Sequence, residues 1–211
     1  MNARSARGFT LVEVLLATVL LAAGLALAFA SVRSAMAISQ RGEAIAAENE
    51  RMRAVQGLLR RQLAAMLRSP LQPLDPTTEP QFFTGDARGM RFVADVPAYL
   101  GRGGAYLHEL QVVPHDGALR LQLGLLLVQD GQVFPERPPR PPEPLLDGLR
   151  EVTLRYRGID PASGALGDWL PEWQDTRRLP VLVAVAIVPR QGPSWPELVV
   201  AVERSGQGPT Q

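Results

Sequence analysis

The sequence predicts an α+β protein in which one long N-terminal helix packs on a mostly antiparallel β-sheet. Three observations support this fold class. An uncharged apolar run fills residues 14–32, and an amphipathic stretch without proline follows it to residue 69. Beyond that point, short apolar runs alternate with Pro and Gly. We therefore expect a transmembrane helix at 9–32, an amphipathic helix at 33–69 and a β-rich globular domain at 70–211.

Composition excludes several classes of protein. The 211 residues are 46% hydrophobic, which is enough to build a core. A formal net charge of +1 provides no general attraction to nucleic acid, so no nucleic-acid partner is expected. The chain has no cysteine, which excludes disulfides, thiolate metal sites and cysteine nucleophiles.

The strongest signal is the uncharged run from Val14 to Val32, whose length suits a helix that crosses a bilayer. Arg4 and Arg7 precede it, so the positive-inside tendency predicts a cytoplasmic N-terminus and an exported remainder. A cleaved signal peptide is the competing interpretation, because residues 28–30 read Ala-Phe-Ala. The apolar region of a signal peptide is usually only about 7–15 residues long and lacks an acidic residue at its start, which favours the membrane anchor.

Glu13 is unusual because it stands at the edge of this apolar run. A carboxylate at the edge of a bilayer is costly and is usually retained for a partner or a function. Glu13 either extends unpaired to the interface or pairs with a positive charge. The nearest such charge would be a new α-amino group on Phe9, created by cleavage after Gly8.

Residues 8–13, Gly-Phe-Thr-Leu-Val-Glu, resemble the prepilin cleavage and methylation motif of type IV pilins and type II secretion pseudopilins. The resemblance implies a pilin-like fold and a cleaved leader at 1–8. It also implies that a prepilin peptidase cuts between Gly8 and Phe9 and methylates the Phe9 amine. Glu13 would then pair with the terminal amine of a neighbouring subunit during assembly, a buried pair that confers specificity more than stability.

The amphipathic stretch continues the helix. Its apolar residues recur every seven positions, at Ile38, Ile45, Met52, Leu59 and Met66. We refer to these five residues as the heptad stripe. One helix from Phe9 to Arg68 would span roughly 90 Å, and Pro70 would follow its end. Polar residues occupy the second seam that a coiled coil would need, so packing of the stripe on a sheet is favoured.

Six later segments are typical of strands, and they cover residues 91–96, 105–113, 118–128, 152–157, 181–188 and 197–203. Between them, residues 135–144 read PERPPRPPEP and predict an extended, left-handed surface loop. A ligand for a proline-binding module is the less favoured interpretation of that stretch. The last residues, 205–211, are expected to be disordered.

No constellation of catalytic side chains is evident, and no cofactor is expected. His108 falls in a strand pattern, where we expect a partly exposed side chain, and neither it nor His115 has an evident partner. The acidic loop at 160–175 could supply oxygen ligands for calcium, but its spacing matches no EF-hand, so we expect turn-capping aspartates and no metal. Trp169 and Trp173 in this loop are candidate partner-facing residues, because aromatic residues anchor interfaces.

The C-terminal half narrows the resemblance to the J-type minor pseudopilins of the type II secretion system, the GspJ family. The resembling features are a strand ending at Tyr156, the loop with Trp169 and Trp173, and an apolar strand led by Pro180. The family implies a non-catalytic subunit of the pseudopilus tip in the inner membrane, with a periplasmic globular domain. Its implied partners are the prepilin peptidase and the I- and K-type minor pseudopilins.

Three alternatives stay open from the sequence. A minor pilin of a type IV pilus or competence system would share the N-terminal motif. A membrane-tethered periplasmic enzyme or ligand-binding domain would need a leader that resembles a prepilin by chance. A plain secreted domain would follow a signal peptide.

Overall fold

In the computed structural model, one long helix, α1, spans Leu11–Ala64. The structure describes residues 10–72, 79–96, 103–129, 132–134 and 141–202. We predicted a helix that begins at Phe9, which lies outside the described residues, and continues to Arg68. The helix ends earlier because Met66 and Leu67 leave it and pair as a short strand, so Pro70 is not what stops it.

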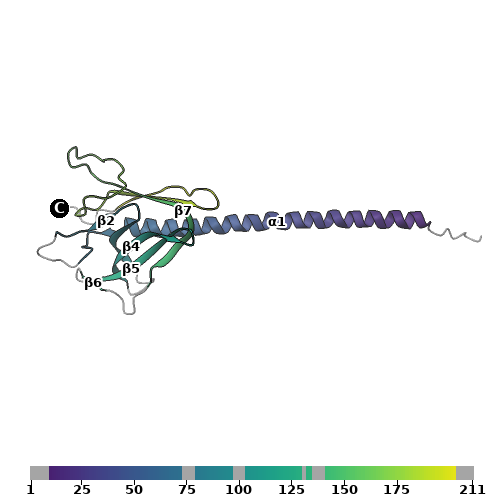
Figure 1. Cartoon of the computed structure of the whole chain (residues 1–211), viewed down its shortest axis with the longest axis horizontal. Helices are drawn as coiled ribbons and strands as arrows, with labels where there is room; N and C mark the ends of the chain where they lie inside the picture. The colour runs from purple at the N-terminus through teal and green to yellow at the C-terminus, as the bar shows by residue number, and fades with distance from the viewer. Residues whose placement is uncertain (1–9, 73–78, 97–102, 130–131, 135–140, 203–211) are drawn as a thin grey trace, which may run out of the picture. The chain divides into compact units, whose positions relative to one another are not determined.

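The chain divides into two compact units, Met1–Arg51 and Met52–Gln211. The described side chains of the first unit all belong to α1 or to Thr10 just before it, and all are exposed. The second unit contains the last turns of α1 and the strands (Figure 1). We predicted that the globular part begins at residue 70. It begins at Met52 because the last turns of the helix belong to its core.

The described strands form one nine-stranded sheet in which every pair is antiparallel. They are β1 (Met66–Leu67), β2 (Phe83–Gly85), β3 (Gly89–Val96), β4 (Gly104–His115), β5 (Ala118–Gln129), β6 (Gln132–Phe134), β7 (Glu143–Arg157), β8 (Leu182–Pro189) and β9 (Leu198–Ala201). Their order is β1-β3-β4-β5-β7-β8-β9, with β2 also on β3 and β6 also on β5. The predicted α+β class with a mostly antiparallel sheet is confirmed.

The predicted strands match β3, β4, β5, β8 and β9 closely, whereas β7 is much longer than its alternating pattern indicated. β7 begins at Glu143, inside the proline-rich stretch that we predicted to be a loop. Pro144 is tolerated because it lies near the start of the strand, where the pairing of β5 with β7 shifts register. Residues 135–140 of that stretch lie outside the described residues.

The longest strand pairing, that of β4 with β5, is joined by a two-residue turn. Asp116 and Gly117 have φ angles of 48° and 70°. Two successive left-handed residues form the type I′ turn that matches the twist of a hairpin, and Asp-Gly is a favoured sequence for it. This turn fixes the register in which Leu110 faces Leu123.

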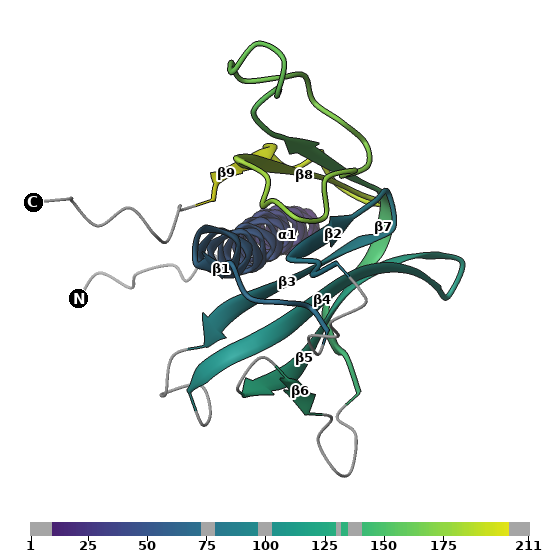
Figure 2. The same cartoon turned by 90° about the vertical axis from the view of Figure 1, so that its left-hand side faces the viewer.

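The main core lies between α1 and the face of the sheet toward it. Val55, Leu59 and Leu63 of the helix are buried there. Figure 2 shows this end of α1 between β3 and β4 on one side and β8 and β9 on the other. The opposite face of the sheet carries a smaller cluster, in which Leu71 covers Val93 and its neighbours.

Only part of the heptad stripe enters this core. Leu59 and Met66 are buried and Met52 packs against the cluster, but Ile38 and Ile45 are 67% and 63% exposed. The prediction that the stripe packs on the sheet is therefore correct only from Met52 onward.

The structure contradicts the predicted surface position of His108, whose side chain is only 1% exposed. The ring stacks on Phe92 at 5.0 Å between centroids, and Nδ1 lies 2.9 Å from the carbonyl oxygen of Tyr106. Burial lowers the pKa of His108 from 6.5 to about 4, although the hydrogen bond to Tyr106 opposes this shift. His115, by contrast, pairs with Asp116 at the surface.

We expect the free energy of unfolding to fall as pH decreases from about 6.5 to about 4. In that window the unfolded chain binds a proton at His108 that the folded chain excludes, which destabilises the fold by up to about 3 kcal/mol. Urea unfolding of the full chain in detergent, followed by tryptophan fluorescence, measures this dependence. His108→Phe should flatten the slope within the window, whereas His115→Gln should retain it. Equal slopes in the parent chain and His108→Phe would contradict the assignment.

Candidate functional site

The N-terminus of α1 is the first candidate site. Thr10 begins the helix, because its Oγ1 and carbonyl oxygen accept hydrogen bonds from the Glu13 N–H at 3.3 and 3.1 Å. Thr10 and Glu13 thus have the spacing of a capping box, in which Glu or Gln at the third position suits the helix start. Gly8 and Phe9 lie outside the described residues, so the predicted cleavage site has no structural description.

The segment that follows is long and apolar enough to cross a membrane. Its most apolar 18-residue window has a mean hydropathy of 2.4, and none of that window is buried. The exposed side chains include Leu11, at 84%, and Phe29, at 73%. A contiguous surface of this kind needs an apolar environment, since soluble monomers rarely expose patches of more than a few hundred Å².

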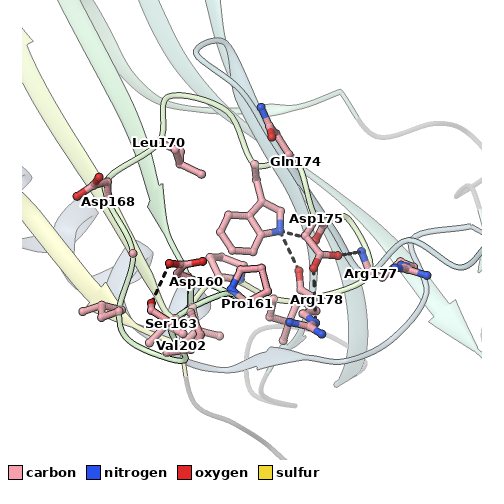
Figure 3. A pocket seen from close by; sticks show the side chains of 18 of the residues that line it. Asp160, Pro161, Ser163, Asp168, Leu170, Gln174, Asp175, Arg177, Arg178 and Val202 are labelled. Carbon is pink, nitrogen blue, oxygen red and sulfur yellow. Dashed lines mark hydrogen bonds and ion pairs between the residues drawn. The ribbon is translucent and has the colours of Figure 1, made fainter.

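The second candidate site is the loop between β7 and β8, residues 158–181, which we call the tryptophan loop. It borders an open cleft of about 1450 Å³. The lining comprises apolar side chains, arginines and aspartates; they include Ile159, Leu166, Leu170, Val202, Arg68, Arg177, Arg178, Asp160, Asp168 and Asp175. Figure 3 shows how the labelled residues surround it. The cleft is amphipathic, with carboxylates balancing the arginines.

Trp173 fixes the tryptophan loop to the core. Its indole N–H donates to the carbonyl oxygens of Asp175 and Arg178, at 2.7 and 2.9 Å. A Cβ on Gly158 would come within 2.4 Å of its ring, so only glycine fits beside it. Trp173 is 9% exposed, and its predicted surface position is wrong because the ring completes a cluster with Phe83.

Tyr156 joins the same cluster at the end of β7. Its ring meets Phe83 edge-on at 5.5 Å, and its hydroxyl donates to the carbonyl oxygen of Asp86 at 3.0 Å. Burial, with a smaller contribution from the Asp86 charge, raises the pKa of this hydroxyl well above its ordinary value. It therefore stays protonated and acts as a structural donor.

Trp169 differs from Trp173, because it lies on the outer face of the sheet and keeps part of its surface accessible. The guanidinium groups of Arg155 and Arg157 lie over its ring, at 5.4 and 5.8 Å from the centroid. These cation–π contacts hold the ring in place. Of the two predicted partner-facing tryptophans, only Trp169 has the exposure that contact with a partner requires.

Two aspartates of the tryptophan loop cap turns. Asp160 accepts hydrogen bonds from the Ala162 N–H and the Ser163 hydroxyl, and these bonds lower its pKa (Figure 3). Asp175 accepts one from the Arg177 N–H. In the part of the chain that the structure describes, no three His, Asp or Glu side chains converge as a metal site would require.

The cleft was not predicted from the sequence. Ile159, Leu166 and Leu170 stand in a stretch rich in Gly, Pro and Asp, which we assigned only as a loop. The one signal that could have revealed it is the presence of three branched apolar residues in a segment that no strand or helix pattern explains.

Comparison with known proteins identifies the family. Residues 30–201 match the family model of type II secretion system protein J. The chain belongs to that family. Residues 3–29 match the model of the prokaryotic N-terminal methylation motif. Proteins of the J family are structural pseudopilins, and with one apolar N-terminal helix the chain is a membrane-anchored minor pseudopilin of type II secretion.

Comparisons with individual proteins support the same family. The chain is 51% identical over 203 residues to the type II secretion system protein J of Xanthomonas campestris pv. campestris, covering 96% of each chain. Among solved structures, it resembles a chain in the crystal structure of the GspK–GspI–GspJ complex from the type 2 secretion system of enterotoxigenic Escherichia coli. That likeness has a TM-score of 0.50 at 16% identity and covers 75% of this chain and 98% of the other. The pilin-like fold of the J protein is thereby confirmed.

The two tryptophans should differ sharply in their effect on stability. Trp173→Ala leaves a cavity beside Phe83 and should lower the free energy of unfolding by about 3–5 kcal/mol. Trp169→Ala removes only partly exposed cation–π contacts and should cost about 1 kcal/mol. Urea unfolding of the full chain at pH 7 measures both, and a larger loss for Trp169→Ala would contradict this division of roles.

Proposed function

We propose that this J protein is a non-catalytic subunit of the pseudopilus tip, where it helps to initiate assembly of the pseudopilus for export of folded proteins. The observation that carries the proposal is the order of features along one chain. A methylation motif at residues 3–29 includes the start of an exposed apolar helix, and the match to the J family follows it over residues 30–201. Such a chain presents a helix for packing and a globular head, which is what an assembly subunit needs.

We further propose four segments and their processing. Residues 1–8 form a leader that the prepilin peptidase removes between Gly8 and Phe9, and the new Phe9 amine is methylated. Residues 9–32 cross the inner membrane, and the amphipathic stretch leads to the globular domain. Because Arg4 and Arg7 precede the apolar run, the N-terminus faces the cytoplasm and the globular domain faces the periplasm.

The partners that we propose are the I- and K-type minor pseudopilins. The solved structure with the same fold is a complex of GspK, GspI and GspJ, which supports this choice. Helix packing would use the small residues Ala17, Ala22, Ala23 and Gly24, which allow close approach in a membrane. Ile38 and Ile45, exposed in the single chain, would extend this contact beyond the membrane.

Processing can be tested directly. We expect a start at methylated Phe9 when the full chain is expressed with a prepilin peptidase, and an intact Met1 without it. N-terminal sequencing and intact mass measure both. A start at Ser31 would indicate a signal peptide and would contradict the proposal.

We propose two separable roles for the Glu13 side chain, namely capping of the helix start and charge pairing with a terminal amine. Glu13→Ala should leave cleavage intact but reduce co-purification of the I- and K-type partners. Glu13→Gln retains the capping capacity and removes the charge, so it should be as defective as Glu13→Ala if pairing with a terminal amine drives assembly. Glu50→Ala, at another exposed glutamate of α1, is the matched control. Normal assembly of Glu13→Gln would assign the residue to capping alone.

A further inference from the structure

The part of α1 that precedes the globular unit carries two charged side chains beside the heptad stripe. Arg41 follows Ile38 by three residues and precedes Ile45 by four. Glu48 follows Ile45 by three. Residues three and four apart are neighbours on a helix surface, so these four side chains form one continuous row. We call this row the mixed seam, and all four of its side chains are exposed.

The two charges of the mixed seam have no partner in the part of the chain that the structure describes. Neither Arg41 nor Glu48 forms an ion pair or a side-chain hydrogen bond there, although Arg51 stands only three residues after Glu48. The sequence has no acidic residue three or four positions from Arg41. The two charges lie roughly 10 Å apart along the helix, too far to pair directly with each other.

Other carboxylates of this part of α1 lie away from the stripe. Glu43 and Glu50 follow the two isoleucines by five residues, which places them on the far side of the helix. Glu43 also accepts a hydrogen bond from Ser39 Oγ at 3.3 Å. These two carboxylates stay in water when a neighbour covers the stripe, whereas Arg41 and Glu48 are drawn into the contact. Because an unpaired buried charge is costly, the neighbour has to supply a partner for each.

We propose that the mixed seam binds the parallel helix of a neighbouring minor pseudopilin that carries its charges in the opposite order. An acidic residue of that helix lies level with Arg41, a basic residue lies level with Glu48, and apolar side chains between them cover the isoleucines. The inference rests on the proposed function and adds its specificity. Charges that flank an apolar seam determine partner choice and orientation in paired helices, so these two fix the neighbour and its axial position.

A second copy of this chain fits the mixed seam less well. In register, a parallel copy sets Arg41 against Arg41 and Glu48 against Glu48, and such like-charge contacts are unfavourable. A copy displaced by one heptad sets its Glu48 beside Arg41, but leaves the other Glu48 opposite Val55, which is buried in the copy's own core. An antiparallel copy pairs both charges, but the two apolar segments then point in opposite directions, which a shared membrane orientation excludes. A different helix satisfies both charges at once.

Charge reversal tests the inference on the full chain, co-purified in detergent with the I- and K-type subunits. We expect Arg41→Glu and Glu48→Arg each to lower recovery of a partner subunit by about tenfold or more. Glu50→Arg, on the far side of the helix, should stay within about twofold of the parent chain. All three side chains are exposed, so urea unfolding of the globular unit should not change.

The outcomes of charge reversal separate the inference from the proposed function. Normal recovery with either Arg41→Glu or Glu48→Arg would overturn the inference and leave the proposed function intact. An equal loss with Glu50→Arg would mean that the position of the charge is irrelevant, and would also overturn it. Failure of the unaltered chain to recover any partner would overturn both.

A single introduced thiol identifies the occupant, because the chain has no cysteine of its own. We expect the thiol of Ile45→Cys to react with a maleimide about tenfold more slowly in the complex than in the isolated chain, whereas Glu50→Cys should change by less than about twofold. Equal reactivity of Ile45→Cys in the two states would overturn the inference. A disulfide-linked dimer of Ile45→Cys within the complex would mean that a second copy covers the seam, and would overturn it as well.

Discussion

Burial of the last turns of α1 is the constraint on which the globular unit depends. Leu59 and Leu63 are almost completely inaccessible, and strands from both halves of the sheet contribute to their cluster. A flat sheet could cover only one side of a helix, so this sheet has to bend around it. β7 makes the bend possible, because it pairs with β5 in its first half and with β8 in its second, with register shifts between paired residues.

A sheet that bends around a helix without closing leaves two edges. The loop between β7 and β8 covers part of one of them. The tryptophan loop crosses to β2 and is held there by Trp173, whose ring fits only because Gly158 has no side chain. The loop thus covers β2 on one edge of the sheet and also borders the amphipathic cleft. Among the described residues, β9 pairs only with β8. The two edges therefore differ because a loop crosses to one of them.

Features set by local sequence were predictable, and features set by distant contacts were not. The apolar helix and the short apolar runs of β3, β5 and β8 are local patterns, so the bounds of these strands could be estimated closely. Burial of His108 depends in part on the Phe92 ring of the neighbouring strand, which its own strand does not reveal. Trp173 was misassigned for the same reason. An aromatic residue in a loop has the same sequence signature whether it faces a partner or closes the loop onto its own core.

The heptad stripe likewise could not be assigned fully from the sequence. The helix that carries it extends beyond the turns that pack in the core of the globular unit. Met52, Leu59 and Met66 contact the chain's own core, but Ile38 and Ile45 have identical spacing and are exposed. Periodicity specifies a face of a helix and not what covers it. A stripe that continues beyond the last intramolecular contact exposes apolar area that the single chain does not bury. In the assembly that we propose, neighbouring helices would bury that area and so couple the fold of this chain to its assembly.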